Sequence, residues 1–392
     1  MSTHIGIVTT HPIQYQAPLF RELSLREDIE VTVYFRHLPD PEGQGKGFDV
    51  DFSWDLPLLE GYSWKVSRKY EEARARNTDL PTFPHFAAAY REVDVMLIHG
   101  WQSAYMRRAW WAGLRADVPL MVRGESNVMK NRPWYIRGLH RMYLKAFNRY
   151  LYIGESNKKF YQNAGVSRED LYPARYCVEN NRFDQDWQKH KDTRSTLREN
   201  FEVEQNAVCF VFCGKFIEKK RPTDVVEGFL GAFDRTNRPI HLLMVGDGKL
   251  QDKVQQRVPA SAPVTFTGFL NQTEIGEAYA AADALVLPSS YGETWGLVVN
   301  EGMIFELPAI VSDRVGCGPD LVQDGKTGFI VPFANVPAIT SAMVRMAEDP
   351  DKLRAMGEKA RENVMSNYTI GAAADGIVRA ATENVEVSMY PG

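Results

Sequence analysis

The chain has 392 residues, which is long for a single domain and typical of two domains. Its hydrophobic and charged fractions, 44% and 24%, are ordinary for a globular protein, and a formal net charge of −4 argues against a nucleic-acid-binding protein. No apolar run reaches the length of a membrane span, and no apolar signal core precedes the first strand-like segment, so we expect a cytoplasmic protein. The four cysteines lack the pairing of a metal site, and we expect them to be buried free thiols.

Apolar strand-like runs alternate with helical segments along the whole chain, which predicts two parallel, doubly wound α/β sheets. In the first half, the expected strands are 4–9, 29–35, 93–99, 119–123 and a run from 150. In the second half, they are 207–213, 240–245, 264–267, 284–287 and 309–311. A polar, charged stretch over 185–200 lies between the two sets. We therefore place a first domain at residues 1–183 and a second at 184–369.

A basic turn directly follows the strand that ends at Cys213. It opens a helix near Thr223, and its four cations are Lys215, Lys219, Lys220 and Arg221. Four cations in one turn after a strand can neutralise the charge of a diphosphate. The alternative is a basic turn that is merely solvated.

Two carboxylates, Glu293 and Glu301, flank a glycine-bearing turn after the strand at 284–287. If a helix begins near Gly296, its free N–H groups favour an anion such as a diphosphate. Glu301 then lies roughly 7–8 Å along the helix axis, far enough to reach a neighbouring hydroxylated ring. A nucleotide-sugar has two sugar rings, the ribose and the donor sugar, joined by a diphosphate. One carboxylate could bind each ring, with the diphosphate held between them. The alternative is a pair of solvated surface carboxylates.

These segments resemble the signature of the family-4 retaining glycosyltransferases. That family has the GT-B fold, in which two Rossmann-like, doubly wound domains face each other across a cleft. The residues that match are Tyr291-Gly292-Glu293, Gly296-Leu297, Glu301-Gly302 and Leu307 to Val311. The resemblance covers most of the chain, but its specific motifs lie within 207–330. It also implies that a C-terminal helix, about residues 370–392, returns to the first domain.

The resemblance implies a role for each matching residue. Glu293 would orient the hydroxyls of the donor sugar, Glu301 would bind the ribose, and Lys215 and Lys220 would pair with the diphosphate. The backbone of the turns would hold the rest of the donor: Gly214, Gly296, Leu297 and Val298 at the phosphates, and Gly268 and Phe269 at the base. The family has Arg where this chain has Lys215, so the charge is kept and the bidentate fork is lost.

We expect no metal ion and no cofactor, because the basic turn and the helix-opening turn can neutralise the leaving diphosphate. Asp49-Val-Asp51 is similar to the metal-binding Asp-x-Asp of GT-A glycosyltransferases. It lies in a loop-rich stretch rather than at the end of a strand, which argues against that role.

Four polar residues at strand ends of the first domain are candidates for the acceptor side: His11, His99, Arg123 and Glu125. Many family members have a glycine-rich loop after the first strand and a histidine near position 123–125. This chain has neither, so the family assigns no acceptor-side group here. Each candidate could equally be a structural residue.

Residues 101–150 hold ten Lys and Arg against two acids, Asp117 and Glu125. Within 130–149 the cations alternate with Trp, Tyr and Phe. A basic aromatic helix can lie on an anionic membrane, which predicts peripheral contact with the inner face of a membrane and a lipid-linked acceptor. The alternative is a cationic helix face that is solvated.

We therefore expect a retaining, metal-independent hexosyltransferase that moves a sugar from a UDP, GDP or dTDP sugar to an acceptor hydroxyl. The acceptor would be a glycan or a lipid-linked glycoconjugate of polysaccharide or glycolipid biosynthesis. Two alternatives remain open: a nucleotide-sugar epimerase on the same fold, and a non-catalytic subunit that binds a nucleotide-sugar.

Overall fold

The computed structural model describes residues 2–38, 53–66 and 84–383. The chain divides into two compact units. The described part of the first comprises 2–38, 57–66, 84–176 and 370–383, and that of the second comprises 53–56 and 177–369. Asp49 and Asp51 lie outside the described residues.

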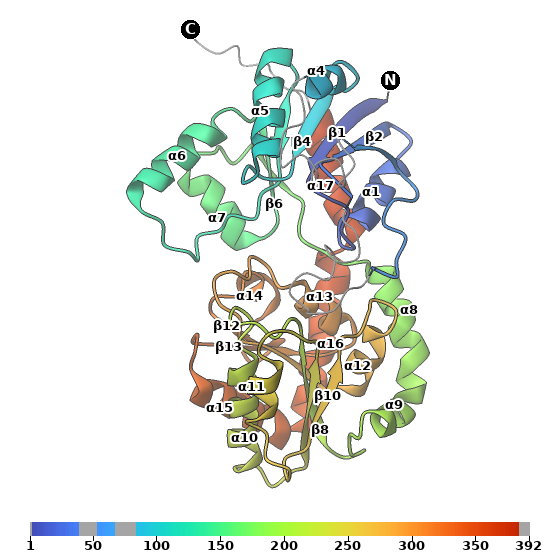
Figure 1. Ribbon diagram of the computed structural model, residues 1–392, viewed down its shortest axis with the longest axis vertical. Coiled ribbons are helices and arrows are strands. Elements are labelled where there is room, and N and C mark those ends of the chain that lie inside the picture. Colours follow the sequence, from blue (N-terminus) through green and yellow to red (C-terminus); the bar gives the residue numbers. More distant parts are fainter. Residues whose placement is uncertain (1, 39–52, 67–83, 384–392) are drawn as a thin grey trace. The chain divides into compact units, whose positions relative to one another are not determined.

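A parallel sheet forms the centre of the first unit (Figure 1). Among the described residues it has seven strands in the order β3-β2-β1-β4-β5-β6-β7. The strands are β1 (Thr3–Thr9), β2 (Ile29–Phe35), β3 (Ser63–Val66), β4 (Val95–Ile98), β5 (Leu120–Val122), β6 (Arg149–Tyr152) and β7 (Leu171–Pro173). Because the chain order reverses between β1 and β4, the carboxyl ends of these two strands mark the topological switch point of the sheet.

Helices cover both faces of this first sheet. They are α1 (Ala17–Ser24), α4 (Pro84–Arg91), α5 (Ala104–Ala116), α6 (Trp134–Leu144), α7 (Glu155–Asn163) and α17 (Ile370–Thr382). Helices α1 and α17 pack together, as do α4 and α5. Helix α17 also packs on β7, so closely that a Cβ at Gly376 would lie 1.6 Å from the carbonyl oxygen of Pro173. Helix α6 is different, because only Leu144 of its residues is buried.

The second unit is built on another parallel sheet. Among the described residues it has six strands in the order β10-β9-β8-β11-β12-β13. They are β8 (Val208–Cys213), β9 (Ile240–Val245), β10 (Val264–Gly268), β11 (Ala284–Leu287), β12 (Ala309–Ser312) and β13 (Gly328–Val331). Every residue of β8, β9, β11 and β12 is buried, as expected for parallel strands covered on both faces.

The helices of the second unit also lie on both sides of its sheet. They are α8 (Asn180–His190), α9 (Arg194–Asn200), α10 (Pro222–Phe233), α11 (Gln251–Gln255), α12 (Ile275–Ala281), α13 (Leu297–Ile304), α14 (Gly318–Leu321), α15 (Val336–Glu348) and α16 (Pro350–Asn367). Helices α10 and α15 pack side by side, and their apolar side chains share one core with the strands (Figure 1). Helices α8, α9 and α12 pack together, and α8 also contacts α13.

The prediction of two parallel, doubly wound α/β sheets is confirmed. The predicted boundary at 183/184 falls within α8, whereas the units divide at Tyr176/Cys177. The physical reason is that α8 packs on α12 and α13, and Phe183 contacts Phe305 with ring centroids 6.3 Å apart. The whole of α8 thus belongs to the second unit.

Candidate functional site

The basic turn and the acid-bearing turn lie next to each other in the second unit. The first follows β8 and the second follows β11, and these two strands pair directly, with Phe210 opposite Ala284 and Val211 opposite Leu285. The chain order of the sheet reverses between them. Ligands of open α/β sheets bind at such a switch point, at the carboxyl ends of the strands.

The two turns are held together by backbone and side-chain contacts. The Ser290 amide donates to the Lys219 carbonyl oxygen at 2.8 Å. The aliphatic part of Lys219 lies over Gly292, where a Cβ would approach Lys219 Cδ to 2.9 Å. Any larger residue at position 292 would therefore displace this lysine.

Glu293 is paired with the cations of the neighbouring turn. Its Oε2 lies 2.5 Å from Lys220 Nζ, and its Oε1 lies 3.8 Å from Lys219 Nζ. Burial by itself would raise the pKa of Glu293, but Lys220 and Lys219 outweigh burial and hold the pKa below its ordinary value. Glu293 is therefore an ionised carboxylate at neutral pH and can accept hydrogen bonds from hydroxyl groups.

The other two cations of the basic turn have different surroundings. Burial, and then the charges of Lys220 and Lys219, lower the pKa of Lys215. Arg221 Nε donates to Asp224 Oδ2 at 2.8 Å, and its guanidinium lies 5.5 Å from the Phe333 ring centroid. Because Arg221 is engaged by Asp224, Lys219 is better placed than Arg221 to support Lys220.

Helix α13 begins at Leu297, with Gly296 as its N-cap in a left-handed conformation (φ 103°). Leu297 and Val298 are half-buried. The first amides of a helix have no acceptor within the helix, and they favour an anion. These two amides follow the turn that carries Glu293, so a diphosphate at this end of the helix would also lie near the lysines.

The turn at 315–318 supports the acid-bearing turn from behind. The Gly316 amide donates to the Glu293 carbonyl at 3.0 Å, and the Cys317 amide donates to the Trp295 carbonyl at 2.9 Å. A Cβ at Gly316 would lie 1.8 Å from the Thr294 carbonyl oxygen, so only glycine fits.

Glu301 is fully buried on α13, with 0% of its surface exposed. The Tyr279 hydroxyl donates to Glu301 Oε2 at 2.7 Å. Burial, followed by the nearby Cys213 and Glu301, raises the pKa of Tyr279 well above its ordinary value, so the tyrosine is neutral and remains a donor. Sequence reasoning missed Tyr279, since it lies 22 positions away on another helix and no motif marks it.

Gly268 is the last residue of β10, and Phe269 follows it at the end of the same sheet. Gly268 has a left-handed backbone (φ 72°), and its carbonyl accepts from the Gly246 amide at 2.8 Å. Gly246 in turn lies against Gly214, where an added Cβ would come within 2.1 Å of the Gly214 carbonyl oxygen. The glycines at the carboxyl ends of β8, β9 and β10 are thus packed closely together.

Three of the four acceptor-side candidates follow neighbouring strands of the first unit: His11 after β1, His99 after β4 and Arg123 after β5. His11 Nδ1 lies 2.9 Å from Thr10 Oγ1, and its ring stacks on His37. Burial, and then the Arg123 charge, lower the pKa of His99 to about 3, so this imidazole is neutral at pH 7.

Arg123 and Glu125 both contact the segment that follows β7. Arg123 is 6% exposed; its Nε donates to the Ala174 carbonyl at 3.0 Å, and its guanidinium lies 4.6 Å from the Tyr176 ring centroid. The Tyr176 hydroxyl donates to Glu125 Oε1. These contacts anchor the end of β7, which is a structural task for Arg123.

Metal-binding side chains are scattered in the part of the chain that the structure describes. No group of three or more His, Cys, Asp or Glu side chains there could hold a metal ion. Cys177, Cys209, Cys213 and Cys317 are all buried free thiols, as predicted.

Residues 193–363 match the family model described as glycosyl transferases group 1. The matched segment contains both turns and α13. The chain is similar to the alpha-D-kanosaminyltransferase of Streptomyces kanamyceticus, with 28% identity over 185 residues, 46% of the chain and 47% of that protein. It is 29% identical over 181 residues to the N-acetyl-alpha-D-glucosaminyl L-malate synthase of Bacillus anthracis, over 45% of the chain and 46% of that protein. The matches thus span about half the length of these curated relatives.

Solved structures resemble this chain over almost its full length. A glycosyltransferase from Rickettsia africae superimposes with a TM-score of 0.75 and 14% identity, covering 99% of the chain and 100% of that structure. HepE of Anabaena, in complex with UDP and glucose, gives a TM-score of 0.72 and 15% identity, over 97% and 100%. These likenesses establish the GT-B fold for the two parallel-sheet units. None of the helices in the described residues combines the length and the apolarity that crossing a membrane requires.

Proposed function

We propose that the protein transfers a hexosyl group from a nucleoside diphosphate sugar to an acceptor hydroxyl, with retention of the anomeric configuration and without a metal ion. The observation that carries this proposal is the pairing of Glu293 with Lys220 and Lys219 at the switch point, beside the first amides of α13. A cationic turn next to an ionised acid suits a ligand that joins a diphosphate to a hydroxylated ring.

In this mechanism, the bond between the anomeric carbon and the diphosphate oxygen breaks, and its electron pair stays on the diphosphate. Lys220, Lys215 and the amides of Leu297 and Val298 stabilise the developing charge. The acceptor oxygen bonds to the anomeric carbon from the same face, and its proton passes to the departing phosphate oxygen. Glu293 accepts hydrogen bonds from the sugar hydroxyls and forms no covalent intermediate.

The buried position of Glu301 adds a condition to its proposed role at the ribose. A carboxylate that is 0% exposed needs a local movement of α13 or of its neighbours before a ribose hydroxyl can reach it. Tyr279 holds the carboxylate in one orientation meanwhile. We therefore expect Glu301 to contribute to donor affinity, with Glu293 and the lysines responsible for the chemistry.

A lipid-linked acceptor is supported by the surface of α6. Its exposed apolar side chains are Trp134 (77%), Met142 (66%), Tyr135 (58%) and Leu139 (53%). Positions 135, 139 and 142 share one helix face, and Arg137, Arg141 and Lys145 form a neighbouring cationic row. No acid occurs between Glu125 and Glu155. Such a helix suits the surface of an anionic membrane, to which each basic residue contributes about 1 kcal/mol.

Among the relatives is a GDP-mannose-dependent mannosyltransferase of Mycolicibacterium smegmatis that acts on phosphatidylinositol monomannoside, 28% identical over 186 residues. We propose that the present protein docks on an anionic membrane surface through α6 and glycosylates a glycan or lipid acceptor there. Co-sedimentation with phosphatidylglycerol vesicles should fall at high salt, and it should fall in Trp134→Ser/Met142→Ser. Vesicle binding that neither change affects would refute the membrane contact.

The transferase proposal is tested with the full chain and a panel of UDP, GDP and dTDP hexoses. A true donor raises the melting temperature, because it binds the folded state. Calorimetry should then show weaker binding in Lys220→Ala and in Glu301→Ala, and NMR of the product should show a retained anomeric configuration. Conversion of the sugar with no acceptor would indicate an epimerase. Binding without transfer or slow hydrolysis would indicate a non-catalytic subunit.

A further inference from the structure

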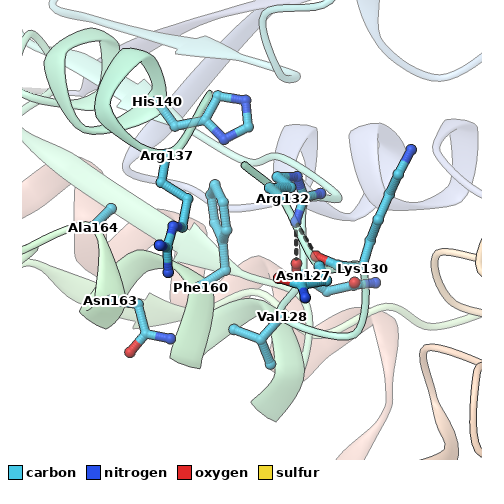
Figure 2. Close-up of a pocket in the computed structure, with 10 residues that line it drawn as sticks. Asn127, Val128, Lys130, Arg132, Arg137, His140, Phe160, Asn163 and Ala164 are labelled. Atoms are coloured by element: carbon cyan, nitrogen blue, oxygen red, sulfur yellow. Dashed lines mark hydrogen bonds between the residues drawn. The ribbon is translucent and has the colours of Figure 1, made fainter. Parts of the chain in front are cut away.

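A cavity of about 150 Å³ lies in the first unit, between the loop at 127–132, helix α6 and helix α7 (Figure 2). Phe160 of α7 and His140 of α6 form part of its wall, and the side chains of Lys130, Arg132 and Arg137 stand around it. The volume is several times the roughly 30 Å³ that a water molecule occupies in the liquid. The cavity is far along the chain from the turns of the second unit, and nothing in the proposed transfer step uses it.

The lining of this cavity is strongly cationic. Three cations, Lys130, Arg132 and Arg137, line it, and no carboxylate is among the lining residues. Lys130 and Arg137 are exposed and form no ion pair with any residue that the structure describes. Exposed cations around one cavity repel one another only weakly in water, and an anion that binds between them would be attracted to all three.

Arg132 is fixed in a position that leaves one edge of its guanidinium available. Its Nη1 donates to the Asn127 carbonyl at 2.6 Å and to the Lys130 carbonyl at 3.3 Å. The guanidinium lies 5.4 Å from the Phe160 ring centroid. Within the described chain, no residue accepts from Nε or Nη2. The N–H groups of this edge are held in place and can donate to two oxygens of one anion.

The imidazole of His140 is also without a hydrogen bond on one side. Its Nδ1 is a buried atom with no partner among the described residues. Burial, and then the Arg132 charge, lower the pKa of His140, so the ring is neutral at pH 7 and its N–H can donate without adding charge. Arg132 of the loop and His140 of α6 both line this cavity.

We propose that this cavity binds a phosphomonoester group. A phosphomonoester carries about −1.5 to −2 charges at pH 7 and three acceptor oxygens, which matches three cations and a fork better than a single carboxylate does. Helix α6 carries both part of the cavity wall and the exposed apolar side chains. When α6 rests on a membrane, a phosphate bound in the cavity would therefore lie at the depth of the lipid headgroups. Its source is either the headgroup of an anionic lipid or a soluble phosphate ester. This proposal does not rest on the transferase activity, since it concerns another ligand in another unit.

The test compares variants that remove cations from the cavity with variants that remove them elsewhere on the same segment. The cavity variant is Lys130→Gln/Arg137→Gln, and the charge-matched control is Arg141→Gln/Lys145→Gln, whose residues are exposed and do not line the cavity. Arg132→Lys keeps the positive charge and removes the paired N–H donors of the guanidinium. Calorimetry of the full chain with glycerol 3-phosphate should give a dissociation constant about tenfold or more higher in both cavity variants. The control should bind like the unaltered protein.

Vesicles distinguish the two sources of the phosphate. Phosphatidic acid and phosphatidylglycerol are compared in phosphatidylcholine vesicles of equal surface charge. A preference for phosphatidic acid that Arg132→Lys removes identifies the lipid headgroup, and binding of glycerol 3-phosphate with no such preference identifies a soluble ester. Equal losses of glycerol 3-phosphate affinity in the cavity and control variants would mean general electrostatic attraction and would overturn the proposal. So would absence of glycerol 3-phosphate binding together with no effect of Arg132→Lys on vesicles.

Discussion

Replacement of Lys220 by methionine tests the ion pair at the centre of the candidate donor site. In the unaltered protein, Glu293 Oε2 lies 2.5 Å from Lys220 Nζ, and the two side chains are 11% and 14% exposed. Removing one partner of a buried pair leaves an uncompensated charge and typically costs about 3–5 kcal/mol. Lys219 remains 3.8 Å from the other carboxylate oxygen, so we expect the lower end, about 3 kcal/mol at pH 8.

The cost should shrink as the pH falls. In the unaltered protein the folded pKa of Glu293 is below its ordinary value, so between pH 5 and 8 the carboxylate is ionised in both the folded and the unfolded chain. In Lys220→Met, burial is opposed only by Lys219 and by the Ser289 hydrogen bond, and we expect the folded pKa of Glu293 to rise above the unfolded one. Stability is then lost as the pH rises toward that folded pKa, by about 1.4 kcal/mol for each unit. We therefore expect a cost of only about 1 kcal/mol at pH 5.5.

Hydrogen exchange of the β8 and β11 amides measures the stability of the second unit, independently of the first. The unaltered protein and Lys220→Met are compared at each pH. Lys220→Met/Glu293→Gln is the control, because it leaves no buried charge, and most of the loss should disappear with its pH dependence. An equal loss at pH 8 and pH 5.5, or a double variant as unstable as the single one, would refute this reasoning.

Three further substitutions follow from the same structure. Gly246→Ala should destabilise the second unit by about 3 kcal/mol in urea unfolding, because a Cβ would meet the Gly214 carbonyl at 2.1 Å and the backbone has φ 127°; a neutral result would contradict the close packing. Tyr279→Phe should cost about 1.5–3 kcal/mol by removing a hydrogen bond to the Glu301 carboxylate, and calorimetry should show weaker nucleotide binding. His99→Gln should flatten the pH dependence of unfolding between about pH 6.5 and 3, since stability is lost there as the unfolded histidine takes up a proton that the folded one does not; an unchanged profile would show that His99 is not buried as a neutral ring.

The fold could be predicted from the sequence because its evidence is local. The strands of the second unit are short, largely apolar runs, and those of β8, β9 and β11 are each followed by a glycine or a polar turn. The start of α13 was also predictable, because Gly296 provides the left-handed N-cap that ends the turn. The position of α8 was not, since its polar sequence hides the buried Phe183 that packs on Phe305.

The candidate site could be predicted only in part, because only some of its contacts are between residues close together in the sequence. The motif places Glu293 and the lysines in two turns, and the pairing of β8 with β11 brings the turns together. The hydrogen-bond partners that fix the orientation of each side chain lie far away in the sequence, and no motif marks them. Tyr279 orients Glu301 from another helix, and the carbonyls after β7 occupy Arg123, which sequence reasoning placed at the acceptor.

The hydrogen bond from Ser290 to Lys219 and the contact of Lys219 with Gly292 have a consequence for protein engineering. The basic turn and the acid-bearing turn are separate in sequence, yet neither can change length or backbone path without moving the other. A chimaera that takes only one of them from a relative would combine two turns whose contacts do not match. To exchange donor preference between relatives, both turns would therefore have to be transferred together, with glycine kept at position 292.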